Sequence, residues 1–249
     1  MNYWQQVPDL KLKGLVRCYW SLDNDSSQNL NFTILPDGFF DLIVRYSNYK
    51  FESISLTGLY TKEVDVQIRQ NTQLFGIQFK LAAAETIFQQ SIAQLLNDEK
   101  LLKNVIWDFN NLSFEETISQ TERLNNLISD IAEENYSYDI RKQRLFQILN
   151  QTKGNQSIKD IAQDVFWSSR QINRYFKRTF GVPLKVYCNI LRCSASYKDI
   201  KKGELYSNQN YFDRSHFNKE IKKHTNHTPK NLLKNENDRF LQISIIPKK

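Results

Sequence analysis

The sequence has few of the residues on which disulfide-linked and membrane-spanning proteins depend. Cys18, Cys188 and Cys193 are its only cysteines, and no two of them form a CxxC pair. Their odd number argues against a disulfide framework, so we expect small buried or partly buried thiols in a reducing cytoplasm. No apolar run approaches the roughly 18 residues of a spanning helix, and the opening MNYWQQVPDLKLKG lacks the apolar core of a signal peptide. We therefore expect a cytoplasmic protein with no membrane partner.

Histidine is equally scarce, and its placement argues against a metalloenzyme. His216, His224 and His227 all lie near the C-terminus, and no carboxylate or cysteine stands beside the HTNH segment that contains two of them. A cupin-like site needs several histidines on an inner strand face. The sequence also lacks GxGxxG, P-loop and GxSxG motifs, and Asp37 and Asp41 fit a turn and a strand end better than paired catalytic carboxylates. We therefore expect no enzyme activity, no catalytic residue, no metal and no cofactor.

Positive charge is scarce in the first three-fifths of the chain and abundant in the rest. Residues 1–150 carry 14 Lys+Arg and 19 Asp+Glu, a net charge of −5, whereas residues 151–249 carry 20 and 8, a net charge of +12. An acidic half joined to a basic half is typical of a regulatory body with a nucleic-acid-binding part. A length of 249 residues also favours two domains.

The acidic half begins with short alternating runs that predict strands. LVRCYWSL, NFTILPDGFFDLIVRY, SISLTGLY, EVDVQIR and QLFGIQFK are each bounded by turn-forming residues. In EVDVQIR, Val64, Val66 and Ile68 alternate with polar residues, which is the period of a half-buried strand. Five aromatic residues of this region fit either an apolar ligand pocket or an ordinary core; they are Trp4, Trp20, Phe39, Phe40 and Tyr60.

Helical periods follow the strands. Residues 81–105 change to a helical pattern, and Ser113 with Glu116 has the capping-box spacing that predicts a helix over 113–135. The stripe of Leu124, Ile128 and Ile131 on this helix fits packing on its own domain or on a second copy of the chain. A further helix near 137–152 is expected to open the basic half.

A cation-rich helix is predicted in WSSRQINRYFKRTFGVP, residues 167–183. Arg170, Asn173, Arg174 and Lys177 fall on one helical face, and Ile172, Tyr175, Phe176 and Thr179 fall on the other. Ser168 and Gln171 predict the start of this helix, and Gly181 with Pro183 predicts its end. The preceding SIKDIAQDVFW predicts a short helix capped by Ser157, so that the two helices form a helix-turn-helix.

A second candidate unit follows a long helix. LKVYCNILRCSASYKDIKK has an apolar side that includes Ile190 and Leu191, and its length suits a connector. In YFDRSHFNKEIKKHTNHTPKNLL, residues 211–233, Asp213 is the expected N-cap and Phe217 and Ile221 the inward side chains. The turn NHTP and a helix PKNLL are then expected to follow.

These residues resemble the DNA-binding domain of AraC/XylS-type regulators, which has two helix-turn-helix units joined by a long helix. IAQDVFWSSRQINRYFKRTFGVPLKVYCNILR is similar to the first unit and its linker helix, and YFDRSHFNKEIKKHTNHTP is similar to the GYxDxSHFxxxFKxxxGxTP signature of the second. The pieces YW (19–20), ILPDGFFDLI (34–43) and LFGIQFKLAAA (74–84) resemble the β-rich domain often fused to such regulators. The resemblance implies a transcriptional regulator whose partner is double-stranded DNA. RNA polymerase, a second copy bound through the N-terminal half and an unidentified small-molecule effector are further candidate partners.

The predicted fold is α+β with two domains. Residues 1–112 are expected to form a β-rich, barrel- or sandwich-like N-terminal domain with helices. Residues 113–136 form a bridging and candidate dimerisation helix, and residues 137–249 an all-α double helix-turn-helix domain. The competing interpretation is a small-molecule sensor or protein-interaction module whose DNA binding is weak or lost.

The sequence departs from the family pattern at both turns. Phe166 and Asn210 replace the turn glycines, and because phenylalanine tolerates positive φ poorly, the first turn is expected to differ in detail. Tyr206 replaces the usual alanine of the second unit's first helix. The segment 200–210 is short and polar, so we expect it to be irregular and not to form a full supporting helix.

Roles for individual residues follow from the proposed docking in the major groove. In the first unit, Arg170, Asn173 and Arg174 are expected to reach base edges, since Arg suits guanine and Asn suits adenine. Phosphate contacts are expected from Lys177, Arg178, Lys201 and Lys202. In the second helix-turn-helix unit the matching positions are Arg214, Ser215, Asn218 and Lys219. This unit is expected to make mainly phosphate contacts, through Arg214, Lys219 and Lys222.

Overall fold

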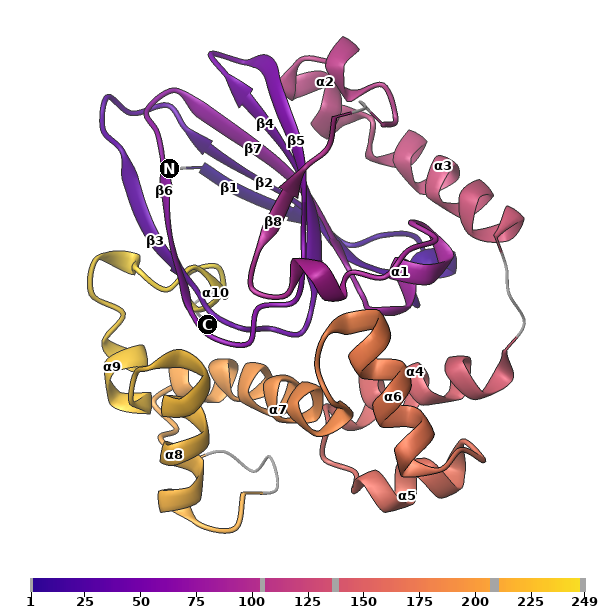
Figure 1. Ribbon diagram of the computed structural model, residues 1–249. Helices are drawn as coiled ribbons and strands as arrows, with labels where there is room; N and C mark the ends of the chain where they lie inside the picture. Colours follow the sequence, from indigo (N-terminus) through magenta and orange to yellow (C-terminus); the bar gives the residue numbers. More distant parts are fainter. Residues whose placement is uncertain (1, 104–105, 136–138, 207–210, 247–249) are drawn as a thin grey trace. The chain divides into compact units, whose positions relative to one another are not determined.

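The computed structural model in Figure 1 describes residues 2–103, 106–135, 139–206 and 211–246. The chain divides into two compact units. The first comprises residues 1–30, 39–59 and 67–138, and the second comprises residues 31–38, 60–66 and 139–249. Two short segments of the N-terminal half thus belong to the same unit as the C-terminal helices.

The first unit is built on a six-stranded antiparallel sheet. Its strands lie in the order β1 (Asn2–Gln6), β2 (Val16–Asn24), β7 (Thr72–Phe79), β4 (Phe40–Ser47), β5 (Lys50–Thr57) and β8 (Glu99–Leu101). β7 is buried along its whole length, as expected for a strand paired on both sides. Gly76 on β7 lies opposite Trp20, and a Cβ at this position would collide with the indole ring. Glycine is therefore required there by close packing.

Short helices accompany this sheet, and one prediction about them is wrong. They are η1 (Leu10–Leu12), α1 (Ala82–Thr86), η2 (Ala93–Leu95), η3 (Phe109–Asn111), α2 (Phe114–Ser119) and α3 (Thr121–Glu134). The helical period over 81–105 produces only α1 and η2, after which the chain continues into β8. Backbone hydrogen bonds from Gly58 N to Asp98 O and from Asn97 N to Leu59 O hold this segment beside β5. Tertiary pairing thus overrides the local helical pattern.

Helix α3 packs within its own unit. The capping box at Ser113 and Glu116 is confirmed, although it starts α2, and the predicted single helix is interrupted at Gln120. Leu124 and Ile128 are buried, and the hydroxyl of Tyr19 on β2 donates to Asn125 Oδ1 at 2.8 Å. Of the two alternatives for this apolar stripe, the structure supports packing inside the chain. A dimer through Leu124 and Ile128 would require this core to open.

The five aromatic residues that fit either an apolar ligand pocket or an ordinary core are mainly engaged in packing. Phe40 is fully buried and stacks on Phe79, with ring centroids 5.5 Å apart. The indole of Trp20 donates to Asp41 Oδ1 at 2.8 Å, which gives this strand carboxylate a structural role. Tyr60 belongs to the other unit. These contacts are those of ordinary core and strand residues.

The second unit contains the C-terminal helices and most of a two-stranded sheet. Its helices are α4 (Ile140–Thr152), α5 (Ile158–Asp164), α6 (Ser169–Phe180), α7 (Leu184–Lys201), α8 (Arg214–Thr225), α9 (Pro229–Lys234), η4 (Glu236–Asp238) and α10 (Leu241–Ser244). β3 (Leu30–Ile34) pairs with β6 (Val64–Ile68). On β6, Val64 and Val66 are half-buried and Ile68 is buried, whereas the two residues between them are exposed, which is the predicted alternation. A β-rich N-terminal half followed by helices confirms the predicted fold class.

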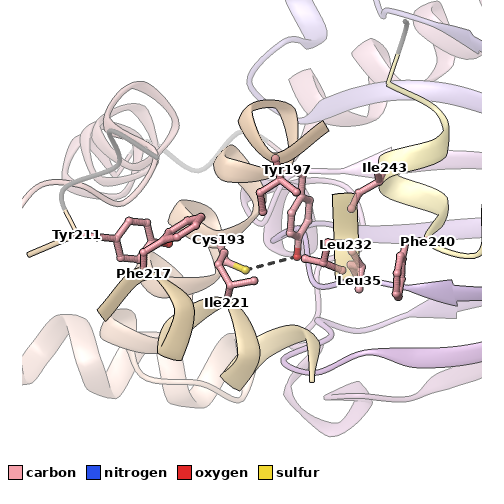
Figure 2. Packing of buried hydrophobic residues seen from close by; sticks show 10 residues of the cluster. Leu35, Cys193, Tyr197, Tyr211, Phe217, Ile221, Leu232, Phe240 and Ile243 are labelled. Atoms are coloured by element: carbon pink, nitrogen blue, oxygen red, sulfur yellow. Dashed lines mark hydrogen bonds between the residues drawn. The ribbon is translucent and has the colours of Figure 1, made fainter. Parts of the chain in front are cut away.

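Helix α7 runs between the pair α5–α6 and the helices α8 and α9 (Figure 1). Its C-terminal half contributes to an apolar cluster with residues far apart in sequence (Figure 2). The cluster consists of Leu35, Cys193, Tyr197, Ile200, Tyr211, Phe217, Ile221, Leu232, Phe240 and Ile243. Leu35 comes from the segment after β3, and Phe240 and Ile243 come from the C-terminal segment. All three cysteines are free and buried, as expected, and burial raises the pKa of the Cys193 thiol to about 12.

Candidate nucleic-acid interface

The first helix-turn-helix has the capping expected from the sequence. The Ser157 hydroxyl accepts from Asp160 N at 3.1 Å and starts α5. At the start of α6, the Ser168 hydroxyl accepts from Gln171 N at 3.2 Å and Gln171 Oε1 accepts from Ser168 N at 2.9 Å. Gly181, with a φ of +81°, ends the helix in the left-handed region. Local signals therefore fix both ends of α6.

The turn between α5 and α6 differs from the expectation. Phe166 has a φ of +54°, so it adopts the left-handed conformation that we expected phenylalanine to avoid. Its N–H donates to Gln163 O at 3.2 Å, and Trp167 N donates to Ala162 O at 3.1 Å. The Trp167 ring lies 5.6 Å from that of Tyr175. These contacts on both sides hold the turn in a conformation that glycine adopts more readily.

One face of α6 is anchored in an aromatic core. Ile172, Phe176 and Phe180 are fully buried. Phe146 on α4 contacts the rings of Phe176 and Phe180, with centroids 6.4 and 6.0 Å away. Such packing fixes the rotation of α6 about its axis, so the opposite face is presented in a defined orientation.

The opposite face of α6 carries exposed cations. Arg170, Arg174, Lys177 and Arg178 are all exposed. Among the described residues, the side chains of Arg170, Arg174 and Lys177 form no hydrogen bond or ion pair with the protein. Because guanidinium and ammonium groups are donors only, this face is suited to acceptors supplied from outside the chain.

Asn173 is placed differently from its expected role. It is half-buried, its Nδ2 donates to Ser169 O at 3.0 Å, and its Oδ1 accepts from Leu184 N at 3.1 Å. The second bond joins α6 to the first residue of α7, whose N–H has no partner within its own helix. Both ends of the amide are thus engaged inside the protein, and contact with adenine would require these bonds to break.

The second helix-turn-helix unit has its expected helix and cap. Asp213 Oδ1 accepts from His216 N at 2.7 Å at the start of α8, and Phe217 and Ile221 are fully buried. Exposed residues on α8 include all five predicted DNA contacts, which are Arg214, Ser215, Asn218, Lys219 and Lys222. The turn and helix predicted after α8 correspond to Asn226–Thr228 and α9, with Thr228 as N-cap.

Aromatic side chains from the segment before α8 support this helix. Helix α7 ends at Lys201, and no helix occurs in the described residues 203–206 and 211–213; Ser207, Asn208, Gln209 and Asn210 lie outside the described residues. The Tyr206 hydroxyl donates to Tyr211 O at 3.2 Å, and the rings of Tyr206 and Tyr211 lie 6.1 and 5.0 Å from that of Phe217. The described part of the segment is irregular, as expected, yet it packs on α8.

The expected phosphate contact by Lys201 is contradicted. Its ammonium donates to Ile243 O at 2.6 Å, to Ser244 O at 3.1 Å and to Ile246 O. These carbonyls lie at the C-terminal end of α10, where a cation satisfies the free acceptors of the helix. Lys202 is exposed.

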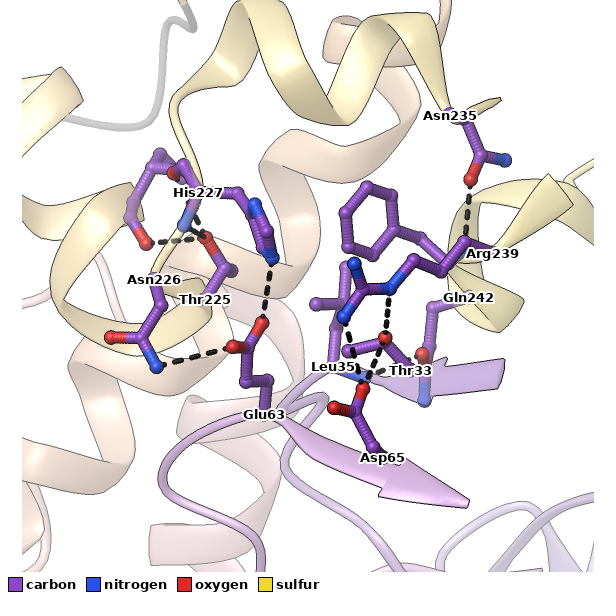
Figure 3. Close-up of polar contacts among 12 residues, drawn as sticks. Thr33, Leu35, Glu63, Asp65, Thr225, Asn226, His227, Asn235, Arg239 and Gln242 are labelled. Carbon is purple, nitrogen blue, oxygen red and sulfur yellow. Dashed lines mark hydrogen bonds and ion pairs between the residues drawn. The ribbon is translucent and has the colours of Figure 1, made fainter. Parts of the chain in front are cut away.

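Two polar clusters join the segments 31–38 and 60–66 to the helices of the second unit (Figure 3). In one, Glu63 accepts from Asn226 Nδ2 at 3.2 Å and lies 3.0 Å from His227 Nε2. In the other, Asp65 Oδ1 lies 2.6 Å from Thr33 Oγ1 and 3.2 Å from Arg239 Nη2. These hydrogen bonds lower the pKa of Asp65, the Thr33 hydroxyl having the largest effect.

The histidines are structural in the described part of the chain. Although no carboxylate is near His227 in sequence, the fold brings Glu63 to it. His224 is buried, and its Nδ1 donates to Thr61 O at 3.1 Å. In residues 2–103, 106–135, 139–206 and 211–246, no three histidine, cysteine or carboxylate side chains are grouped as metal ligands. Within the same ranges, no helix is sufficiently long and apolar to span a membrane.

Comparison with known families gives a match in the N-terminal half. Residues 5–100 match the family model described as Domain of unknown function (DUF6597). This domain is associated with AraC-type regulators, which agrees with the resemblance found in the helical half. No curated protein matches the chain.

Several solved structures of one protein, ToxT from Vibrio cholerae, are similar to the chain. An apo lysine-to-alanine variant from strain SCE256 has 10% identity and a TM-score of 0.45, with 92% of this chain and 98% of that chain covered. ToxT from strain O395 has 13% identity and a TM-score of 0.42, with 98% of each chain covered. Wild-type ToxT bound to an unsaturated fatty acid has 13% identity and a TM-score of 0.40, with 94% of each chain covered.

Sequence reasoning missed the residues that connect the DUF6597-matching region to the C-terminal helices. Thr33, Glu63 and Asp65 stand in ordinary strand and loop contexts, and Arg239 follows the last predicted helix. Their partners lie 163 to 206 residues away in the chain. No periodic or capping signal reports such pairs, so only the folded structure identifies them.

Proposed function

We propose that the chain is a transcriptional regulator, without enzyme activity, that binds double-stranded DNA with α6 in the major groove. The observation that carries the proposal is the division of α6 into two faces. One face is locked by Ile172, Phe176 and Phe180, and the other exposes Arg170, Arg174 and Lys177 to solvent. A rigid helix with a free cationic face is what base and phosphate recognition in a groove requires.

The two ends of this face are proposed to have different roles. Arg170 and Arg174 lie in the first two turns of α6, and the N-terminal residues of a recognition helix contact base edges. Each guanidinium can donate two hydrogen bonds to guanine O6 and N7. Lys177 and Arg178 lie further along and are proposed to contact phosphates, which fix register and carry no sequence information.

In the second helix-turn-helix unit we propose mainly phosphate contacts. Arg214, Lys219 and Lys222 are exposed on α8, with Ser215 and Asn218 beside them. These side chains would strengthen binding to any duplex. Contacts with RNA polymerase, a second copy of the chain and a small-molecule effector stay predictions from the sequence.

Titration of the full-length protein with random duplex DNA at several salt concentrations tests the proposal. Affinity is expected to fall steeply with salt, with a logarithmic slope of about −0.9 for each phosphate neutralised. A triple variant with alanine at Arg170, Arg174 and Lys177 is the matched control, since these exposed side chains do not support the fold. A wild-type protein with no salt-dependent binding would favour the sensor or protein-interaction module instead.

A further inference from the structure

Phe166, in the turn before α6, is in an unfavourable environment on two counts. Its side chain is 83% exposed, and its φ of +54° lies in the left-handed region. Exposing a large aromatic ring to water and holding a residue with a Cβ in this region both cost free energy. Glycine, which stands at this turn in the family that the sequence resembles, would avoid both costs.

The turn itself does not need the Phe166 ring. Val165 is fully buried, and Trp167 packs on Tyr175, so the residues on either side anchor the chain. The backbone N–H of Phe166 donates to Gln163 O, a bond that glycine would also make. The ring thus adds little to the isolated fold, and a use for it lies in contact with a partner.

Phe212 has a similar arrangement in the second helix-turn-helix unit. It directly precedes Asp213, the N-cap of α8, and its side chain is 92% exposed. Its N–H donates to His216 Nδ1 at 3.3 Å, which ties its backbone to the first turn of α8. Phe166 precedes Ser168, the N-cap of α6, by two residues. Among the described residues, Phe212 and Phe166 are the two most exposed large apolar side chains, and each stands at the start of a helix proposed to contact DNA.

We propose that Phe166 and Phe212 make apolar contacts with DNA, against thymine methyl groups or deoxyribose, beside the N-terminal end of each helix. This inference rests on the proposed function. Arg170 follows Phe166 by four residues, and Arg214 follows Phe212 by two, so each ring is accompanied by an exposed cation. DNA satisfies both features at once, because its phosphates attract the cations and its sugars and thymine methyls offer apolar surface. An apolar protein surface would leave the cations without partners.

The test compares affinity and salt dependence in full-length variants. Phe166→Gly and Phe212→Ala are expected to lower affinity for a duplex selected by the wild type about tenfold, while the salt slope stays unchanged, because an apolar contact releases no counterion. Lys177→Ala is expected to reduce the slope by about one. Ile140→Ala is the matched control, because Ile140 is also exposed and apolar, at the start of α4. Its affinity should equal that of the wild type.

Two further measurements separate folding from binding and methyl from sugar contacts. Phe166→Gly relieves the backbone, so its thermal midpoint should equal or exceed that of the wild type even as DNA binding weakens. Deoxyuridine in place of single thymines in the selected duplex should weaken the wild type but not the variant if the ring touches that methyl group. If no thymine behaves in this way while the variants still bind weakly, the contact is with deoxyribose.

The outcomes are distinguishable from failure of the proposed function. Phenylalanine variants that bind as tightly as the wild type, in a protein that still shows salt-dependent binding, would overturn this inference alone. A wild-type protein without salt-dependent DNA binding would overturn the proposed function and this inference with it.

Discussion

Tyr197 on α7 donates its hydroxyl to the backbone carbonyl of Pro36, 161 residues earlier in the chain, at 2.8 Å. Tyr187 on the same helix donates to Gly38 O at 3.2 Å. Both phenols are buried, and this burial raises the pKa of each far above its ordinary value. The segment 36–38 is therefore fixed to α7 by two hydroxyl groups that are neutral near pH 7.

Tyr197→Phe should destabilise the second unit. The change leaves the carbonyl of Pro36 buried without this donor, and leaving a buried acceptor unsatisfied costs about 1–3 kcal/mol. We expect a lower midpoint of urea denaturation with an unchanged slope. Tyr49→Phe is the matched control, because the Tyr49 hydroxyl is exposed and lies 3.4 Å from Asp23. Equal shifts in the two variants would contradict a special role for the Pro36 contact.

Asn173→Ala should lower the stability of the fold rather than change which DNA sequence the protein recognises. It removes the bonds to Ser169 O and Leu184 N that tie α6 to α7, and each such bond is worth about 0.5–1.5 kcal/mol. The thermal midpoint is expected to fall, whereas Arg174→Ala should leave it unchanged. An Asn173→Ala variant with the wild-type midpoint and a selective loss of cognate affinity would instead show that the amide reads adenine.

Arg174→Ala and Arg214→Ala should differ in their effect on specificity. If Arg174 reads a base, its removal costs about 1–3 kcal/mol on the cognate duplex and much less on random DNA. Arg214→Ala should weaken binding to all sequences alike, since a phosphate contact carries no sequence information. The comparison needs one selected duplex and one scrambled duplex at the same salt concentration. A selected site with two equally sharp blocks of bases about one helical turn apart would show that α8 also reads sequence.

His224 should make stability depend on pH. Burial lowers the pKa of its imidazole. The hydrogen bond to Thr61 O and the charge of Glu220 oppose this effect, and the charges of Lys223 and Arg192 add to it. Below the ordinary histidine pKa of about 6.5, the unfolded chain takes up a proton that the folded chain resists. Stability is then lost as pH falls through and below that value. In His224→Gln this contribution is absent, so the difference in unfolding free energy between wild type and variant should shrink as the pH is lowered from neutral. A difference that is constant with pH would contradict the assignment.

The sequence was sufficient where structure depends on residues within about four positions. Ser157, Ser168 and Asp213 each cap the predicted helix, because a cap needs only a side-chain acceptor beside the first free N–H groups. The buried and exposed faces of α6 follow in the same way from helical period. The sequence could thus predict that Arg170 and Arg174 lie on the exposed face of α6 and that Phe176 and Phe180 lie on its buried face.

Prediction from local sequence patterns failed where the structure depends on contacts between residues far apart in the chain. Residues 81–105 have helical spacing, but pairing with β5 converts part of them into β8. Asn173 has the position of a base-reading residue, and only the approach of Leu184 N shows that its carbonyl oxygen is occupied. Phe166 violates the steric preference for negative φ, since anchored neighbours impose the turn on it. In each case the deciding partner is supplied by packing that sequence periodicity does not report.

The assignment of residues 31–38 and 60–66 to the unit with the C-terminal helices constrains how such a chain can be recombined. Both segments lie inside the range that matches DUF6597, yet Leu35 completes the cluster around Tyr197 and Phe240. A chimera joined in the region before α4 would carry foreign residues into that cluster and remove the partner of the Tyr197 hydroxyl. Grafting these helices onto a different N-terminal domain would therefore require transplanting the two segments as well. Substitutions in the two segments should be inherited together with compensating changes in α7 and in the chain after α9.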